Sequence, residues 1–355
     1  MRGLAVVIMI QCHTFNSLAR LDLREGGPYV LSQFVGGMAA PLFLFMAGMT
    51  SAFLMETLER RGVAPWQRYL AALGRAGYIF SIACLFRLTN WAATVPRGSS
   101  QELLRVDILN CMGLAMAVVA VVAVLDGGAR ARVAAAMALL IAAAAPVMAG
   151  LAWDRVPRVV QEYLVPAGGR GQFPLFPCAA YLGFGLAAGT IVKRSAAERF
   201  ERLMQWSVVI GFGLIFTAQY FANVPYSIYS RSNFWLDSPA LVIIRTGIAL
   251  LMLAGSYLWT EYCRGAGWSW IECIGKNSLM VYWVHVILVY GTLVQPLKRS
   301  LSIPLTALAV VLVTGLMVAL SALWLWWKCR RAARWRARTT VAGGLMAPAG
   351  VSGRS

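Results

Sequence analysis

The chain has two histidines, His13 and His285, and each stands in an otherwise apolar segment. The imidazole ring titrates near neutral pH, so it can take up and return a proton, and its neutral form can attack an acyl carbonyl. A carboxylate such as Asp107 would fix the tautomer of the ring and stabilise its cation, as in a catalytic triad. We therefore predict an acyl-transfer site with His13 and Asp107 as its catalytic residues. For His285, a structural hydrogen bond between helices is the alternative interpretation.

Membrane helices must position these residues. Of the 355 residues, 59% are hydrophobic and 13% are charged, whereas soluble proteins carry about 25% charged residues. Apolar segments of about the length that crosses a ~30 Å hydrocarbon core recur at 3–17, 29–55, 69–90, 107–125, 133–153, 173–192, 205–222, 239–260, 270–293 and 303–327. The predicted fold class is all-α: a polytopic integral membrane protein with about ten transmembrane helices. Residues 1–330 are predicted to form one transmembrane acyltransferase-like domain, and residues 331–355 a basic, disordered cytoplasmic tail.

The net charge of +18 would suggest nucleic-acid binding in a soluble protein. Here Lys and Arg gather in alternate loops, and the richer side holds both chain ends. Cytoplasmic loops carry this excess in membrane proteins, so both termini are predicted to be cytoplasmic, in a bacterial plasma (inner) membrane. No nucleic-acid partner is expected. The basic residues between 328 and 338 are expected to contact anionic membrane lipid instead.

Most polar side chains inside the apolar segments fall at the predicted outer side. Ionisable groups in a membrane cost several kcal/mol each, so they are candidates for function. The candidate substrate-binding residues are Asn16, Arg87, Asn90, Arg105, Asn110, Arg245 and His285. Snorkelling toward lipid headgroups is the alternative role for Arg87 and Arg105. Arg245 lies too deep to snorkel and is expected to pair with a carboxylate such as Asp107, so we predict that His13, Asp107, Asn110 and Arg245 converge in one cavity.

Five stretches together resemble a known family. They are RGLAVVIMIQCH at 2–13, APLFLFMAG at 40–48, RVDILN at 105–110, FPLFP at 173–177 and NSLMVYWVH at 277–285. Their order and spacing are similar to those of the bacterial relatives of the heparan-alpha-glucosaminide N-acetyltransferase catalytic domain, a group of membrane acyltransferases. The resemblance covers roughly residues 2–327. In that family the first helix usually follows an upstream Asp or Arg, so further residues before Met1 are expected.

The resemblance implies that an acetyl group moves from cytosolic acetyl-CoA to a glucosamine amine across the membrane, with an active-site histidine that His13 matches best. It implies acyl-CoA as donor substrate with no bound cofactor, and an extracytoplasmic sugar hydroxyl or amine, on a glycan or an amine compound, as acceptor. Guanidinium and ammonium groups bind phosphates well. The candidate residues for the CoA phosphates are Arg60, Arg61, Arg68, Arg75, Lys193 and Arg194. For most of these the alternative is a purely topological charge.

Two other functions stay open. A transporter or flippase of a sugar-like or lipid-linked solute would use helices broken near the membrane midplane and inverted repeats. No internal repeat is evident, but Pro41 and Pro146 are expected to break two helices. The third possibility is an assembly partner without catalytic activity. Gly185 and Gly189 indicate close helix packing rather than a ligand site, and the seven cysteines, which lack CxxC spacing, predict no metal site.

Overall fold

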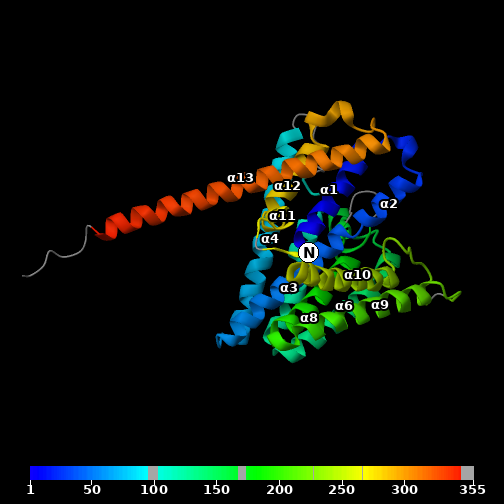
Figure 1. The fold of residues 1–355 in the computed structure, drawn as a ribbon. Helices are drawn as coiled ribbons and strands as arrows, with labels where there is room; N and C mark the ends of the chain where they lie inside the picture. Colours follow the sequence, from blue (N-terminus) through cyan, green and yellow to red (C-terminus); the bar gives the residue numbers. More distant parts are fainter. Residues whose placement is uncertain (95–102, 167–172, 227, 266, 345–355) are drawn as a thin grey trace, which may run out of the picture.

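The computed structural model describes residues 1–94, 103–166, 173–226, 228–265 and 267–344 (Figure 1). The longer helices are α1 (Arg2–Leu18), α2 (Gly27–Gly36), α3 (Ala39–Arg60), α4 (Pro65–Thr94), α5 (Ile108–Val119), α6 (Gly127–Gly150), α7 (Arg158–Leu164), α8 (Leu175–Arg194), α9 (Phe200–Ala222), α10 (Pro239–Leu258), α11 (Trp270–Lys276), α12 (Ser278–Tyr290) and α13 (Ile303–Gly344). Short helical turns join them at η1 (Leu21–Leu23), η3 (Ala120–Val124), η4 (Ala197–Arg199), η5 (Trp259–Cys263) and η6 (Thr292–Leu297). The predicted all-α class is confirmed.

Seven helical segments of the described residues are long and apolar enough to cross a membrane, and α11 with α12 makes an eighth if the bent pair is one span. The chain is therefore a multi-pass membrane protein. The prediction of about ten spans is not confirmed, because α1 has 17 residues and rises about 26 Å, short of a ~30 Å core. The apolar helix at Ile108–Val124 is equally short.

Glycines bring α3 and α8 into backbone contact. A Cβ atom added to Gly48 would lie 2.0 Å from the Leu182 carbonyl oxygen, and one added to Gly185 would lie 1.9 Å from that of Phe45. A Cβ atom at Gly189 would lie 2.6 Å from Met49 Cα. The small residues thus have the packing role that the sequence indicated, since a side chain at these positions would force the helices apart.

The C-terminal end of α1 is fixed to the end of α12 and to the segment that follows it. The Ser17 hydroxyl donates to the Val289 carbonyl oxygen at 2.7 Å, and the backbone of Leu18 accepts from the Leu301 amide at 3.0 Å. α1 also packs against α2, α3, α11 and α13. This central position carries His13 into contact with the C-terminal part of the chain.

Pro41 and Pro146 do not break the helices that contain them. Pro41 lies in the first turn of α3, and α6 continues through Pro146, so the expectation of two proline-broken helices is wrong. Instead, the backbone of α8 is non-helical at Phe176, and a sharp break lies between α11 and α12, which meet at Asn277 with an angle of 89°. This bend sets the direction of α12, which carries His285.

The last helix extends beyond the other helices. Figure 1 shows α13 passing α12 and α1 and then running away from the rest of the fold. It continues through residue 331 to Gly344, so the first part of the predicted disordered tail is helical, as its Ala and Arg content favours. Residues 345–355 of that predicted tail lie outside the described residues.

Candidate functional site

The two histidines form a pair. His13 Nδ1 on α1 and His285 Nε2 on α12 lie 2.9 Å apart, and the two rings are inclined by only 9°. His285 is fully buried, whereas His13 is half-buried. Of the two rings, His13 is therefore the one that a substrate can reach.

A second hydrogen bond fixes the tautomers of the neutral pair. His285 Nδ1 lies 2.7 Å from the Val281 carbonyl oxygen. A carbonyl oxygen only accepts, so His285 Nδ1 carries the proton and His285 Nε2 is an acceptor. His13 Nδ1 must then donate to His285, which leaves the lone pair of His13 Nε2 free. The pair thus presents one unprotonated imidazole nitrogen on the accessible ring, the atom that a general base or a nucleophile requires.

Polar and aromatic groups line the C-terminal end of α1 next to His13. The Tyr290 ring packs edge-on against His13 at 5.5 Å between ring centroids, and its hydroxyl accepts from Asn16 Nδ2 at 3.3 Å. Tyr29 donates to Asn16 Oδ1 at 3.5 Å, and Arg24 donates to the Asn16 carbonyl oxygen at 2.7 Å. Asn16 was predicted to belong to the site. The two tyrosines and Arg24 were not, because only the folded chain brings them to Asn16.

Asp107 has a different partner from the one predicted. Arg87 Nε lies 3.0 Å from Asp107 Oδ2, and Asp107 Oδ1 accepts from the amides of Leu109 and Asn110 at 3.0 Å each. Asp107 is therefore the N-cap of α5 and neutralises Arg87. It makes no hydrogen bond to His13, so the predicted contact between this carboxylate and the imidazole is not found. The hydrogen-bond partner of the His13 ring is His285 instead.

The Arg87–Asp107 pair nevertheless belongs to the surroundings of the histidines. Phe86, next to Arg87 in α4, packs on Tyr282 at 4.9 Å between centroids, and Tyr282 packs on His285 at 6.0 Å. Arg105 lies within electrostatic range of Tyr282 and Tyr290. Phe86 and Tyr282 thus connect the Arg87–Asp107 pair to His285.

Arg245 contacts α2 and α8. Its Nη2 atom would lie 3.0 Å from a Cβ atom added to Gly37, and its guanidinium group lies within electrostatic range of the Tyr181 hydroxyl. The predicted pairing of Arg245 with Asp107 is wrong, because Arg87 occupies that carboxylate. Asn110 interacts with the Tyr163 hydroxyl, and Asn90 is half-buried near the end of α4.

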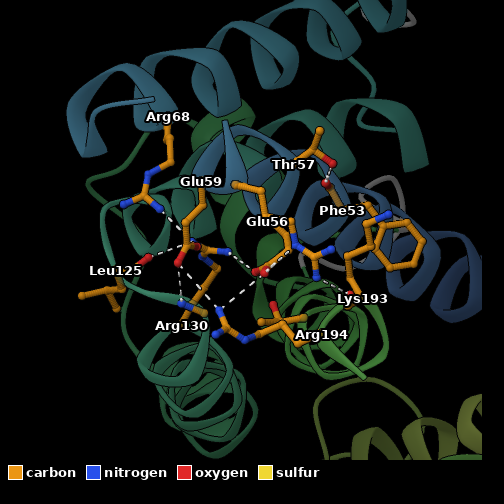
Figure 2. A network of polar contacts seen from close by, with 12 residues as sticks. Phe53, Glu56, Thr57, Glu59, Arg68, Leu125, Arg130, Lys193 and Arg194 are labelled. Carbon is orange, nitrogen blue, oxygen red and sulfur yellow. Dashed lines mark hydrogen bonds and ion pairs between the residues drawn. The ribbon is translucent and has the colours of Figure 1, made fainter. Parts of the chain in front are cut away.

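At the opposite end of the bundle, four helices meet in a network of ion pairs (Figure 2). Two acidic residues of α3 form its centre: Glu56 contacts Arg60, Arg130 and Arg194, and Glu59 contacts Arg68, Arg130 and Arg194. Arg130 is fully buried and also donates to the Leu125 carbonyl oxygen at 2.7 Å. Figure 2 shows the guanidinium groups pointing inward at the two carboxylates.

Sequence analysis missed Glu56, Glu59 and Arg130. Residues three apart share a face of a helix, and two acidic residues at that spacing in an apolar helix are a usable signal of an ion-pair site.

A hollow of about 350 Å³ is lined by Glu56, Glu59, Arg60 and Arg194. The predicted donor-binding cations differ in their partners. Three of them, Arg60, Arg68 and Arg194, form ion pairs with carboxylates. Arg75 instead donates to Thr50 Oγ1 at 3.3 Å.

The two other predicted donor-binding cations are exposed at the same end of the bundle. Arg61 caps α3, and Lys193 lies over the Phe53 ring at 5.9 Å. The six cations therefore divide by partner: Arg60, Arg68 and Arg194 are held by carboxylates, Arg75 is bound to Thr50, and Arg61 and Lys193 are in no ion pair among the described residues.

Comparison with known proteins assigns the chain to a family. Residues 1–225 match the family described as heparan-alpha-glucosaminide N-acetyltransferase, catalytic. A search of curated proteins gave no match. The matched region includes His13, the Arg87–Asp107 pair and the ion-pair network, while His285 follows it in sequence. The chain belongs to the heparan-alpha-glucosaminide N-acetyltransferase catalytic domain family.

Proposed function

We propose that this membrane protein is an acetyl-CoA-dependent acetyltransferase that acts across the bilayer. Its donor is cytoplasmic acetyl-CoA, and its acceptor is a sugar hydroxyl or amine on the extracytoplasmic side. Both chain termini lie in the cytoplasm, and the membrane is the bacterial plasma membrane. Membership of the family supports the acetyl transfer. The two polar ends of the bundle support a donor that enters from one face and an acceptor that binds at the other.

The histidine pair is the single observation that carries this function. The free Nε2 atom of His13 attacks the thioester carbonyl of acetyl-CoA, the C–S bond breaks, and CoA leaves as the thiol after it takes up a proton. The acetyl-imidazolium is a cation, and His285 stabilises it because the His13 Nδ1–H donates to its Nε2 atom. The acceptor amine or hydroxyl then attacks the acetyl carbon, loses its proton, and restores the free imidazole.

The remaining polar residues position these groups. Asn16, Tyr290 and Tyr29 offer hydroxyl and amide groups beside His13, of the kind that bind sugars by hydrogen bonds. Asp107 holds Arg87 beside Phe86, and it acts on the site through Arg87 rather than through His13. Arg105 completes the cationic surroundings at this end.

Proteoliposomes test the function directly. The full-length protein is reconstituted with acetyl-CoA on one side and glucosamine on the other. N-acetylglucosamine should appear in the glucosamine compartment and CoA in the donor compartment. His13→Ala protein should give neither product above the level of empty vesicles. Free CoA release without acetylated product from any of several sugars and amines would contradict the transfer reaction.

One observation favours the alternative of a transporter. The 89° bend between α11 and α12 resembles the broken helices that transporters use at their binding sites. The same proteoliposomes separate the two functions: a transporter would move the unmodified sugar across the membrane without acetyl-CoA. The acetyltransferase proposal requires that flux of unmodified glucosamine equals that of empty vesicles.

A further inference from the structure

The Tyr290 hydroxyl, at the end of α12, has a hydrogen to donate. Its oxygen accepts from Asn16 Nδ2 at 3.3 Å, and a tyrosine hydroxyl carries one donor hydrogen besides its acceptor lone pairs. Among the described residues, no oxygen within 3.5 Å accepts that hydrogen. Tyr290 is 39% exposed, so a bound molecule can reach the group. The hydroxyl is therefore a donor that a substrate can use.

Asn16 fixes the position of this hydroxyl. The Tyr29 hydroxyl donates to Asn16 Oδ1 at 3.5 Å, and Arg24 donates to the Asn16 carbonyl oxygen at 2.7 Å. The amide nitrogen of Asn16 faces Tyr290, and an amide nitrogen only donates. The Tyr29 hydrogen is thus used within this chain of hydrogen bonds, whereas the Tyr290 hydrogen at its end remains free.

The hydroxyl lies beside the ring that carries the free nitrogen. Asn16 follows His13 by three residues in α1, so the two side chains share one face of the helix. The Tyr290 ring meets the His13 ring edge-on, with 5.5 Å between centroids and 62° between ring planes. His13 Nδ1 is occupied by His285 at 2.9 Å, so an acetyl group on His13 can form only on Nε2. Tyr290 is therefore a direct neighbour of the ring that would be acetylated.

Acyl transfer requires a hydrogen-bond donor at this place. The acetyl oxygen gains a full negative charge when a nucleophile adds to the carbonyl carbon, and fixed donors aimed at that oxygen lower the barrier. His285 cannot supply one, because its Nε2 atom accepts from His13 and its Nδ1 hydrogen is bound to the Val281 carbonyl oxygen. Of the two rings that pack on His13 in the described part of the chain, only Tyr290 has an unused hydrogen.

We propose that the Tyr290 hydroxyl is a catalytic residue that stabilises the oxyanion of both tetrahedral intermediates. This inference rests on the proposed acetyltransferase function and adds a residue to its reaction. In each intermediate the Tyr290 O–H donates to the former carbonyl oxygen. The carbonyl reforms as the C–S bond breaks in the first step and as the C–N bond to His13 breaks in the second. Tyr290 transfers no proton, and Asn16 keeps a second Nδ2 hydrogen for the acceptor.

Tyr290→Phe removes the hydroxyl and keeps the ring. In the proteoliposome assay its kcat should fall by about 10²- to 10³-fold, the loss that follows removal of one oxyanion donor. The KM for each substrate should stay within about threefold, because the donor acts on a charge that exists only near the transition state. Tyr220→Phe, at an exposed position of α9, is the matched control and should keep the activity of the unchanged protein.

Two results of this assay would overturn the inference. One is a kcat within threefold of that of the unchanged protein in a Tyr290→Phe variant with an unchanged Tm. The other is a raised KM for the acceptor with an unchanged kcat, because Tyr290 would then bind the sugar rather than the oxyanion.

An activated ester tests Tyr290 without CoA or a sugar. Neutral imidazole attacks p-nitrophenyl acetate and releases coloured p-nitrophenol. The rate that the full-length protein in detergent loses on His13→Ala substitution is the part due to His13. Tyr290→Phe should lower that part at least about tenfold. An equal rate in the unchanged and the Tyr290→Phe proteins would overturn the inference, and so would the absence of any rate due to His13. A lowered rate in a protein that acetylates no sugar would support Tyr290 and contradict the proposed function alone.

Discussion

His13 Nδ1 and His285 Nε2 lie 2.9 Å apart although the two residues are 272 positions apart in the chain. The Val281 carbonyl oxygen accepts from His285 Nδ1, so one backbone group determines which nitrogen of His13 is free. An imidazole thus performs the orienting task that a carboxylate performs in a catalytic triad. A neutral partner leaves the site without the buried negative charge that a carboxylate would add.

Substitution of His285 separates an orienting role from a packing role. His285→Gln places an amide near the position of Nε2 and can accept from His13 Nδ1, whereas His285→Ala cannot. We expect kcat to fall in the order unchanged protein, His285→Gln, His285→Ala, with little change in the KM for acetyl-CoA. Equal activity of the Gln and Ala variants would show that the hydrogen bond does not orient His13. Both variants should lose less activity than His13→Ala.

The Arg87–Asp107 pair should contribute to stability. Its side chains are 16% and 5% exposed, and removal of one partner from a buried pair costs about 3 kcal/mol because the other charge stays unpaired. Asp107→Asn keeps an N-cap for α5, while Asp107→Ala loses both the cap and the ion pair. The apparent Tm in detergent should fall in the order unchanged protein, Asp107→Asn, Asp107→Ala. A higher Tm for Asp107→Ala than for Asp107→Asn would contradict the capping role.

The ion-pair network depends on the buried Arg130. Arg130→Met should lower the apparent Tm more than Arg132→Met does, because it leaves Glu56 and Glu59 next to each other with one fewer cation. Removal of a buried partner of this kind costs about 3 to 5 kcal/mol. The measurement is thermal unfolding of the two purified variants in the same detergent. Equal Tm values would show that the network adds nothing to the fold.

Close packing of α3 on α8 should be sensitive at Gly185. A Cβ atom there would lie 1.9 Å from the Phe45 carbonyl oxygen, so Gly185→Val must push two helices apart. Gly213 of α9 has no atom within 4 Å of an added Cβ atom and gives the matched control, Gly213→Val. The yield of monodisperse protein from the membrane should fall sharply for Gly185→Val alone. Similar yields for the two variants would count against the backbone contact.

The sequence allows some of this architecture to be predicted, because apolar length and helix packing are local properties. The segments at 29–55 and 173–192 correspond to α2–α3 and α8, and Gly185 and Gly189 have the packing role that their spacing indicated. Ten spans are not shown, because α1 and the apolar helix at Ile108–Val124 have only 17 residues each and fall short of a full crossing. The N-cap role of Asp107 is local as well, whereas its partner Arg87 depends on how α4 packs against α5.

Side-chain contacts between helices that are far apart in the sequence could not be predicted. The direction of α12 follows from the bend at Asn277, and no periodicity in the sequence indicates an angle of 89°. The sequence therefore predicts His285 as a substrate-binding or structural residue, and it places Asp107 rather than His285 beside His13. The contacts of Arg130 with Glu56 and Glu59 likewise exist only once α6 lies against α3.

Acetyl transfer by His13→Ala protein tests the central claim most directly. A general base contributes about 10²- to 10⁴-fold in rate, and a nucleophile contributes more. Cys12→Ala, at the neighbouring position of α1, is the matched control, and equal elution and Tm values verify that both variants fold. The account predicts that radioactive acetyl transfer from acetyl-CoA to glucosamine falls by at least about 10²-fold in His13→Ala and stays within a few-fold in Cys12→Ala. Near-normal transfer by a folded His13→Ala protein would contradict it.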